Sequence, residues 1–478
     1  MLKRLLISIV MLSLASCQVI TSTNGTQPTP EQATPTPIVS TLPVPSPTPT
    51  VVDPALAQQA AIAALSQDKG YPADQIQLTS TESVEWQDRC LGVVIPGVMC
   101  AQGLVPGYKI VLSAYGSSYE YHTNQDGTSV LLVHSHVVRI AVRTPDGSVQ
   151  IVPIDVQNTL QPPTPAAQNF LPSGGSARGT VYALSNASPS SVTATDASGT
   201  RTLDFIQKPN YGLAVWPGDA TNSPLLAWGT YLNYDTMMTE LFVSAPDGSG
   251  LVTLLSEKVE STPPYSLIAQ RFSADGKSLY FSKEPYGIGG YILFGGASSL
   301  YRIDLTSKQV TEIIPLDLKK TQSPFICLDA FSVDYSVVAD HCTPGVITVR
   351  SLDTGHSVTI LPPTVVKDKS ILGSARFSPD GSRLAFAGAK GNPDAEQGWL
   401  AVSDGLGSSS SLIITSQPGQ YFTVLGWLND STLLVQTNTS MCGTAECSNG
   451  VWTVAVDGSS QNKVAEGTFI SFVDGYMP

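Results

Sequence analysis

Four side chains between residues 86 and 122 have the chemistry of a small binding site. Trp86 offers an aromatic face on which a sugar or a peptide can stack. Asp88, Tyr121 and His122 offer acid, base and hydrogen-bonding groups. A Trp and Tyr pair beside two cysteines is also typical of the core of a small domain. We favour this structural interpretation over a ligand contact, and we expect no catalytic residue here.

Three histidines could supply metal ligands. His134 and His136 alternate along a predicted strand and therefore share a face, and His122 could add a third imidazole. Their spacing fixes no carboxylate and no fourth ligand. We therefore prefer to interpret them as exposed hairpin residues, and we expect neither a metal nor another cofactor.

The cysteines indicate local disulfides. Seven is an odd number, which in a secreted protein leaves one thiol without a partner. Setting Cys17 aside as a lipidation site leaves three pairs that are close in sequence. These pairs are Cys90 with Cys100, Cys327 with Cys342, and Cys442 with Cys447. Local pairing is the simplest of the possible connectivities in an oxidising compartment, and a zinc site would need four such ligands together.

Residues 1–17 are predicted to be an export signal. Two basic residues precede an apolar run, Leu5–Leu14, that is too short to span a bilayer. The following Leu-Ala-Ser-Cys resembles the bacterial lipobox, in which the cysteine, here Cys17, is acylated after cleavage. A plain secretory peptide is the alternative. We expect a lipid anchor at the cell membrane or outer membrane, facing the periplasm or the cell exterior.

Changes in amino-acid composition after residue 17 predict a tether, a small domain and a second linker. Residues 18–54 are rich in Pro and Thr and predict a disordered, semi-stiff tether. Residues 55–158 predict a small α+β domain, with one helix after Pro54 and antiparallel strands that end in the hairpin 137–156. A Pro- and Gly-rich stretch, residues 159–176, predicts a second linker and a domain boundary.

The small domain resembles a module found in bacterial secreted proteins and lipoproteins. The motifs that carry the resemblance are Val84-Glu-Trp-Gln-Asp88, Cys90-Leu-Gly92, Cys100-Ala101, Pro106-Gly-Tyr108 and Tyr119-Glu-Tyr-His-Thr123. That module has no assigned activity. The resemblance therefore implies no catalytic role for any of these residues.

Residues 177–478 repeat one pattern, a strand, a tight Asp-Gly turn and a second strand. The clearest copies are 269–281 and 374–386, and each unit continues with two more strands. Four short strands per unit are typical of a propeller blade. The Phe-Ser-Pro-Asp-Gly motif with Leu-Tyr-Arg-Ile-Asp resembles the TolB-type, WD-repeat-like propellers of bacterial envelopes, which implies a mainly β fold.

The number of units predicts how the ring closes. Five full units begin near Tyr211, Tyr265, Pro324, Lys369 and Gln420. Residues 180–205 supply three further strands, and residues 468–473 supply one. Pairing these two segments would complete a sixth blade and remove two free sheet edges. We therefore predict a six-bladed propeller, with seven blades as the alternative.

Charge and motifs restrict the function. The formal net charge is −13, with Asp+Glu 38 against Lys+Arg 25, which argues against a nucleic-acid partner. The hydrolase motif Gly-x-Ser-x-Gly and phosphate-binding loops are absent from the sequence. We predict a monomeric, membrane-anchored binding protein whose ligand is an envelope protein, a peptide or a glycan. A glycan- or peptide-acting enzyme with carboxylates in the channel, or a structural envelope scaffold, are the alternatives.

Overall fold

The computed structural model describes most of residues 53–478. The described ranges are 53–69, 71–93, 99–114, 117–133, 137–155, 174–185, 190–285, 294–317, 327–332, 336–366, 370–378, 380–390, 397–407, 409–439 and 450–473. The predicted signal with Cys17, nearly all of the tether, most of the 159–176 linker, His134 with His136, and Cys442 with Cys447 lie outside them. The fold is mainly β. No helix in these ranges is long and apolar enough to cross a bilayer.

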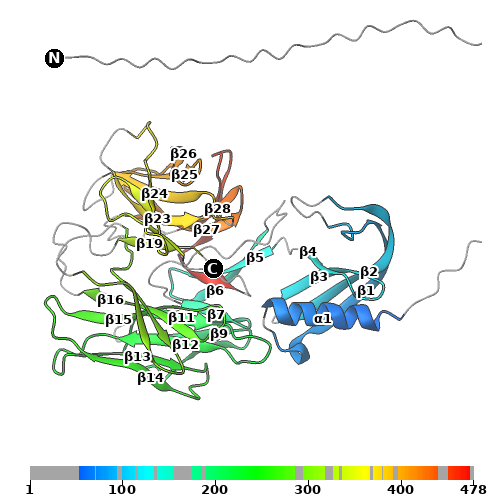
Figure 1. Cartoon of the computed structure of the whole chain (residues 1–478), viewed down its shortest axis with the longest axis horizontal. Helices are drawn as coiled ribbons and strands as arrows, with labels where there is room; N and C mark the ends of the chain where they lie inside the picture. The colour runs from blue at the N-terminus through cyan, green and yellow to red at the C-terminus, as the bar shows by residue number, and fades with distance from the viewer. Residues whose placement is uncertain are drawn as a thin grey trace, which may run out of the picture. The chain divides into compact units, whose positions relative to one another are not determined.

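Helix α1 packs on one face of a four-stranded antiparallel sheet (Figure 1). The elements are α1 Ala55–Lys69, a 3-10 turn Ala73–Gln75, β1 Gln77–Asp88, β2 Gln102–Ala114, β3 Ser117–Asn124 and β4 Val130–Val133, in the order β1-β2-β3-β4. Ala57, Ala61 and Leu65 recur every four residues and form one buried stripe on the helix. That stripe packs against Ile110 and Leu112 of β2. This part of the fold is α+β, as expected.

Seven antiparallel sheets follow in the rest of the described chain. Four-stranded sheets are formed by β7 Gly174–Ala177, β8 Thr180–Leu184, β9 Val192–Asp196 and β10 Gly199–Thr202; by β11 Pro209–Trp216, β12 Leu225–Thr230, β13 Met238–Ser244 and β14 Val252–Lys258; and by β15 Tyr265–Phe272, β16 Ser278–Pro285, β17 Leu300–Asp304 and β18 Val310–Ile314. Three more are formed by β19 Leu328–Phe331, β20 Val337–Asp340, β21 Ile347–Ser351 and β22 Ser357–Ile360; by β23 Ile371–Phe377, β24 Leu384–Lys390, β25 Gln397–Ser403 and β26 Ser410–Thr415; and by β27 Gln420–Asn429, β28 Thr432–Thr439, β29 Gly450–Ala455 and β30 Gln461–Glu466. The seventh sheet has three strands in the order β31-β5-β6, with β31 Thr468–Val473, β5 Val137–Arg143 and β6 Val149–Asp155.

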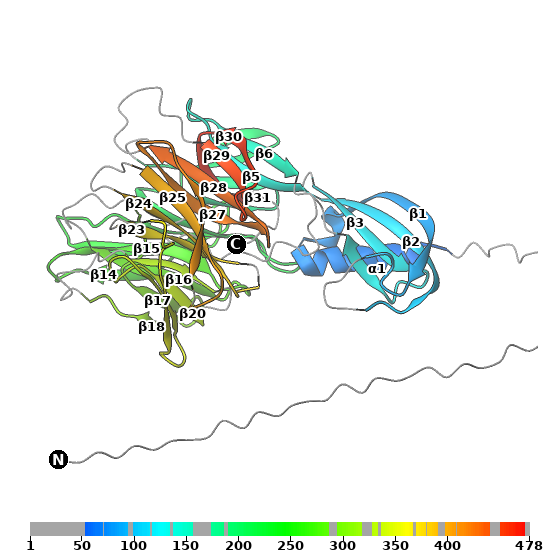
Figure 2. The same ribbon diagram turned by 90° about the horizontal axis from the view of Figure 1, so that it is seen from above.

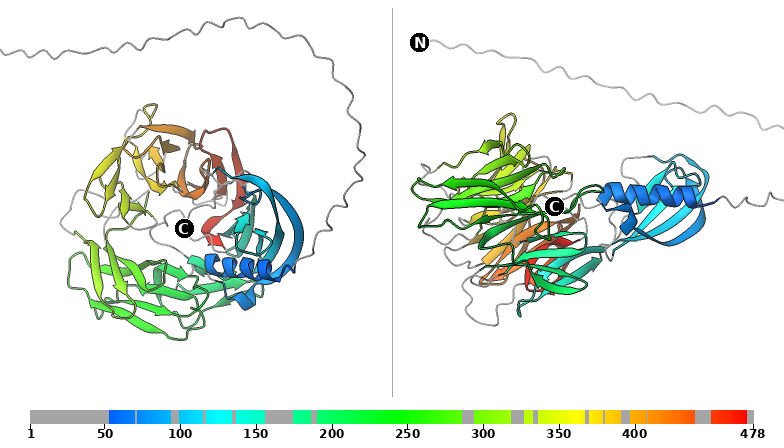
Figure 3. Two further views of the ribbon diagram at one scale, coloured as in Figure 1. Left: turned by 45° about the vertical axis from the view of Figure 1, so that its right-hand side comes forward. Right: turned by 90° about the horizontal axis from the view of Figure 1, so that it is seen from below.

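Buried hydrophobic clusters join these sheets in a closed order, which Figure 3 (left) shows as a ring of sheets. Each four-stranded sheet shares a cluster with the next one along the chain. The three-stranded sheet shares one cluster with β27–β30, through Ile140 and Leu434, and another with β7–β10, through Ala141 and Val181. Figure 2 shows β31, β5 and β6 beside β29 and β30. The last sheet therefore closes the ring.

The closing pair of strands is not the predicted one. β31 pairs antiparallel with β5, with Ser471 opposite Ala141, and not with the strand that begins at Thr180. The reason is that Gly174–Ala177 already supplies the first strand of the β7–β10 sheet. Its sequence, Gly-Gly-Ser-Ala, lacks the branched and aromatic residues by which strands are identified. The prediction therefore omitted this strand and left the sheet β7–β10 with only three.

The last hairpin assigned to the small domain also belongs to the ring. β5 and β6 pair with each other and with β31, not with β1–β4, so the prediction that residues 137–156 extend the small sheet is wrong. The 159–176 stretch consequently connects two neighbouring sheets of the ring rather than two domains. The hydrophobic alternation of residues 137–142 suits either sheet, because it specifies a buried face but not a partner.

The connections at the two ends of the strands differ. Tight Asp turns join first to second strands, as where the Asp275 carboxylate accepts hydrogen bonds from Ser273 Oγ and Lys277 N and Gly276 has a φ of 67°. The four longest connections within and between the four-stranded sheets are 286–299, 315–327, 361–370 and 440–449. All four follow a second or a fourth strand, and the ends of those strands are opposite the ends that carry the Asp turns. We call that end the loop face.

Candidate functional site

Trp86 and His122, two of the possible ligand contacts, lie together, but their side chains interact with other residues of the small domain. Their rings stack at a centroid distance of 4.0 Å, and Trp86 Nε1 donates to Thr123 O at 2.9 Å. His122 Nδ1 lies 2.7 Å from Leu91 O, and its Nε2 lies 3.1 Å from a Glu120 carboxylate oxygen. Trp86 is buried. Both rings thus have all their polar atoms engaged within the domain.

Asp88 and Tyr121 also have structural surroundings. Asp88 Oδ1 accepts hydrogen bonds from the backbone N–H groups of Cys90 and Gly92, at 2.8 and 3.3 Å. It therefore stabilises the turn that contains Cys90, which forms a disulfide with Cys100. The two sulfurs and this carboxylate lie close together, but bonded sulfurs are not thiolate ligands. Tyr121 is buried in the core, and burial raises the pKa of its hydroxyl.

Truncating Trp86 should therefore destabilise the small domain. We expect Trp86→Ala to cost about 3–5 kcal/mol, because a large buried side chain leaves a cavity. Trp86→Phe keeps most of the volume and loses the bond to Thr123 O, so about 1 kcal/mol is expected. Hydrogen exchange of the β2 and β3 amides measures both values. Equal protection in Trp86→Ala and the unsubstituted protein would contradict the structural interpretation.

Within the described residues, buried Asp, Glu, His and Arg side chains occur only between residues 284 and 376. They are Glu284, Asp329, Asp340, His341 and Arg376. All of them come from three neighbouring sheets of the ring. Buried charges are costly unless they are paired, so their concentration in one sector requires an explanation.

Asp329 is the centre of this cluster. One carboxylate oxygen lies 2.8 Å from His341 Nδ1, and the other accepts a hydrogen bond from Ser374 N at 3.0 Å. The Asp329 carbonyl oxygen accepts a bond from Arg376 Nη1 at 3.2 Å. Ser374 and Arg376 belong to β23, so this one aspartate ties the sheet β19–β22 to the sheet β23–β26.

In the neighbouring sheet, β15–β18, the uncharged pair Gln270–Ser282 occupies the position that Asp329 and His341 occupy in the sheet β19–β22. Gln270 and Asp329 both precede a buried Phe by two residues and both sit at a β-bulge of a first strand. Gln270 Nε2 donates to Ser282 Oγ at 2.7 Å, in the place where Asp329 meets His341. A neutral pair is therefore sufficient for packing at this position. The ionisable pair is an addition that packing does not require.

The cluster sets unusual protonation equilibria. Burial lowers the pKa of His341, but its attraction to Asp329, the hydrogen bond between them and the charge of Asp340 together raise it above the ordinary value. Burial raises the pKa of Asp340, against the effects of Cys342 N, Arg350 and His341. Burial also lowers the pKa of Arg376 to about 10. No described residue bonds His341 Nε2, so this atom is the one through which the pair could meet a ligand.

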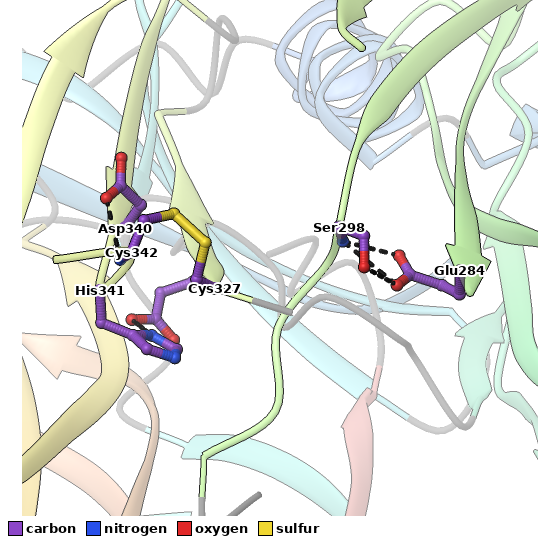
Figure 4. Close-up of a disulfide and its surroundings, with 7 residues drawn as sticks. Glu284, Ser298, Cys327, Asp340, His341 and Cys342 are labelled. Atoms are coloured by element: carbon purple, nitrogen blue, oxygen red, sulfur yellow. Dashed lines mark hydrogen bonds and ion pairs between the residues drawn. A yellow bond between two sulfur atoms is a disulfide. The ribbon is translucent and has the colours of Figure 1, made fainter. Parts of the chain in front are cut away.

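Glu284 is a second ionisable group at the same face of the ring. It lies at the end of β16, and His341 directly follows β20, so both stand where a second strand meets the loop face (Figure 4). Its carboxylate accepts bonds from Ser298 N at 2.9 and 3.2 Å and from Ser298 Oγ at 2.6 Å. Burial raises its pKa to about 7, against the hydrogen bonds from Ser298 and Ser282. This carboxyl group therefore changes charge near neutral pH.

Glu284→Gln should stabilise the ring at alkaline pH. The pKa is raised from 4.5 to about 7, so between these values the folded state keeps a proton that the unfolded state has lost. The stability from this group is present below pH 4.5 and is lost as the pH rises towards 7. We expect the variant to be about 2–3 kcal/mol more stable at pH 8 and nearly unchanged at pH 4.5. Denaturant unfolding at both pH values measures this.

The exposed Glu312 of β18 provides the matched control for that experiment. Glu312→Gln should change the free energy of unfolding by less than about 0.5 kcal/mol at either pH. A Glu284→Gln variant whose stability difference does not depend on pH would contradict the assignment of a raised pKa.

The Cys327–Cys342 disulfide lies beside His341 (Figure 4). Cys327 directly precedes β19 and Cys342 directly follows His341, and the sequence separation of the two cysteines is 15. His341 N donates to Cys327 O at 2.9 Å, and Cys342 N donates to an Asp340 carboxylate oxygen at 3.2 Å. A disulfide that closes a loop of this length contributes about 3 kcal/mol on the chain-entropy account. Two of the three expected disulfides are thus present, and the third lies outside the described residues.

The cysteines of this site are evident from the sequence, but its ionisable groups are not. Asp329 is the only charged residue in the strand Leu-Asp-Ala-Phe, and it occupies the place of Gln270 in the preceding unit. Alignment of the repeats on their shared Phe would have identified it. Glu284 and His341 carry no comparable signal, because Glu284 lies at the end of an ordinary strand and His341 directly follows one.

Comparisons with known proteins match part of the chain. Residues 58–132 match a family described as a domain of unknown function, DUF8738. No curated protein matches the sequence.

The solved structures that resemble the fold are remote. The tricorn protease has 13% identity and a TM-score of 0.37 over 75% of this chain, which spans only 38% of that chain. TolB from Agrobacterium tumefaciens has 11% identity and a TM-score of 0.32, covering 72% of this chain and 95% of the other. The β-propeller domain of the Trilobed protease from Pyrococcus furiosus has 12% identity and a TM-score of 0.34, covering 63% and 96%. Similarities at this level do not extend to function.

Proposed function

We propose that this chain is a lipid-anchored, extracytoplasmic binding protein that uses the loop face of its ring to hold a ligand. In this proposal Cys17 carries the anchor and the Pro- and Thr-rich residues 18–54 form the tether. The ring is a seven-bladed β-propeller, with β31, β5 and β6 as its seventh and smallest blade. The ligand is an envelope protein, a peptide or a glycan.

The observation that carries the proposal is the concentration of buried ionisable groups in one sector of the ring. Glu284 lies at the end of the second strand β16, and His341 directly follows the second strand β20. The equivalent pair in the neighbouring sheet is neutral, so packing at this position does not require ionisable groups. Rigid scaffolds that present loops are where binding residues usually lie.

Exposed aromatic side chains on the same face support a stacking contact. Tyr231 and Tyr234, in the connection between β12 and β13, are 43% and 66% exposed. Their backbone is held in place, because Leu232 N donates to Ser266 Oγ and the Asn233 side chain caps Asp235 N. Tyrosine supplies a large, rigid contact area at low entropic cost, which suits sugars and peptides alike.

An enzymatic function is the second candidate, and His341 is the observation that favours it. A histidine whose Nδ1 is held by a carboxylate and whose Nε2 has no described partner has the arrangement of a general base. No described Ser or Cys side chain is bonded to that Nε2. The proposal therefore treats the pair as a ligand contact, and turnover of a glycan or peptide would show instead that it is catalytic. A purely structural scaffold is the third possibility.

Glycan and peptide arrays separate these functions. The delipidated full chain should show saturable binding without product, and His341→Gln should weaken binding at least tenfold, while Glu312→Gln, on the exposed outer strand β18, should leave it unchanged. Product formation that is lost in His341→Gln would favour the enzyme. Absence of binding together with capture of envelope proteins would favour the scaffold.

A further inference from the structure

We propose that the Cys327–Cys342 disulfide is a clamp that positions His341 against Asp329 at the loop face. The clamp would make Cys327 and Cys342 positioning residues of the proposed binding site. This inference rests on the proposed function for its purpose, but its geometry and its test concern the histidine alone.

The clamp is needed because the local sheet is short. β19 and β20 have four residues each, and their paired register ends at Leu328 opposite Asp340. His341 lies one residue beyond that last pair. The bond from His341 N to Cys327 O extends the ladder to it, and the disulfide ties Cys327 to the next residue, Cys342.

The neighbouring sheet shows what a longer ladder does instead. β15 and β16 have eight residues each, and their register continues from Phe272 opposite Leu279 to Tyr265 opposite Pro285. The Gln270–Ser282 pair therefore lies inside the ladder, with paired residues on both sides. It needs no covalent link. In β19–β20, His341 lies beyond the last residue pair of the register, and the disulfide supplies a covalent link there.

His341 has several charged neighbours, and the clamp determines which of them it meets. Asp329 on β19 contacts its ring, Asp340 precedes it, Arg350 on β21 acts on Asp340, and Arg376 on β23 bonds the Asp329 backbone. If the end of β20 swung away from β19, His341 would lose Asp329 and gain water. Its protonation equilibrium would then approach that of an ordinary histidine.

The test is an NMR pH titration of His341 in the full chain. The chain has 5 histidines, and the His341→Gln variant assigns the resonance. In the Cys327→Ser/Cys342→Ser double variant the His341 pKa should fall towards about 6.5, as it should in Asp329→Asn. The matched control is Cys90→Ser/Cys100→Ser, which removes the other described disulfide and should leave the His341 pKa unchanged. An unchanged His341 pKa in the first variant would overturn the proposal.

A second measurement applies if the double variant does not fold. A small dithiol added to the folded, unsubstituted protein reduces each accessible disulfide to two thiols with two electrons and two protons, and the dithiol becomes a cyclic disulfide. The Trp427 Nε1–H resonance, whose donor bonds Arg376 O at 3.1 Å, reports whether the ring stays folded. With that resonance intact, loss of the raised His341 pKa supports the clamp and its retention after complete reduction refutes it. Failure of the arrays with the disulfide intact would bear only on the proposed function.

Discussion

Deletion of residues 468–478 should open the ring and abolish its cooperative unfolding. The deletion removes β31, whose buried Ile470, Phe472 and Val473 pack against the sheets on both sides. Burial of each such side chain contributes about 1.5–3 kcal/mol, so the loss approaches the total stability of a typical domain, about 5–15 kcal/mol. It also leaves β5 as an unpaired edge.

Thermal unfolding and size-exclusion chromatography measure this effect. We expect loss of the main calorimetric transition and concentration-dependent aggregation in the deletion variant. The matched control lacks only residues 474–478, keeps β31 and should unfold like the intact chain. A deletion variant that remains monomeric with its transition shifted by only a few degrees would contradict the closing role of β31.

Asp329→Ala should destabilise the ring by about 3–5 kcal/mol. The substitution removes the counterion of the buried His341, and it leaves Ser374 N without an acceptor. The matched control is Gln270→Ala, which removes the neutral version of the pair in the neighbouring sheet. The control should cost about 1–2 kcal/mol, because it removes a neutral partner and no buried charge is left unpaired.

Denaturant unfolding of the two variants at pH 6 and pH 8 tests this difference. Because the His341 pKa is raised by Asp329, the ion pair stabilises the folded state fully below the ordinary histidine pKa, and this contribution is lost as the pH rises through the raised value. The difference between the two variants in the loss of unfolding free energy should therefore be smaller at pH 8 than at pH 6. Equal costs at both pH values would show that Asp329 acts through packing alone.

Much of the fold was predictable from local patterns. The Asp-Gly turns identify the strand pairs around Gly276 and Gly381, and both glycines have positive φ, as such turns require. The helix after Pro54 follows from an Ala-rich segment without Gly or Pro. Spacing along the sequence was enough to predict the disulfides Cys90–Cys100 and Cys327–Cys342. Each of these features depends on residues that are close in the sequence.

The closure of the ring was not predictable in the same way. β31 pairs with β5 across more than three hundred residues, and the hydrophobic alternation of residues 468–473 suits any open sheet edge. The decisive strand was Gly174–Ala177, which pairs with β8 although its residues have low strand propensity. Its place is set by the sheets on either side of it. Tertiary context here outweighed local preference.

The residues that the sequence offered for a ligand contact differ from those of the proposed site. Trp86 and His122 have the chemistry of a binding site, but their polar atoms are engaged by the fold. Asp329, His341 and Glu284 are ordinary in sequence and unusual only in burial, which depends on how neighbouring sheets pack. A pattern of residue types reports which groups are present, and it does not report which are buried.

A designed disulfide tests the closed ring most directly, since the loop face exists as one surface only if β31 joins β5. Ala141→Cys with Ser471→Cys places thiols at residues that are directly opposite in the β5–β31 register. Opposite residues of antiparallel strands are about 4.5–5.5 Å apart at Cα, within the range of a disulfide. Peptide mass spectrometry after mild oxidation should find the 141–471 crosslink and should find none in the alternative variant, Thr180→Cys with Ser471→Cys. A crosslink between 180 and 471, without one between 141 and 471, would contradict the closed ring described above.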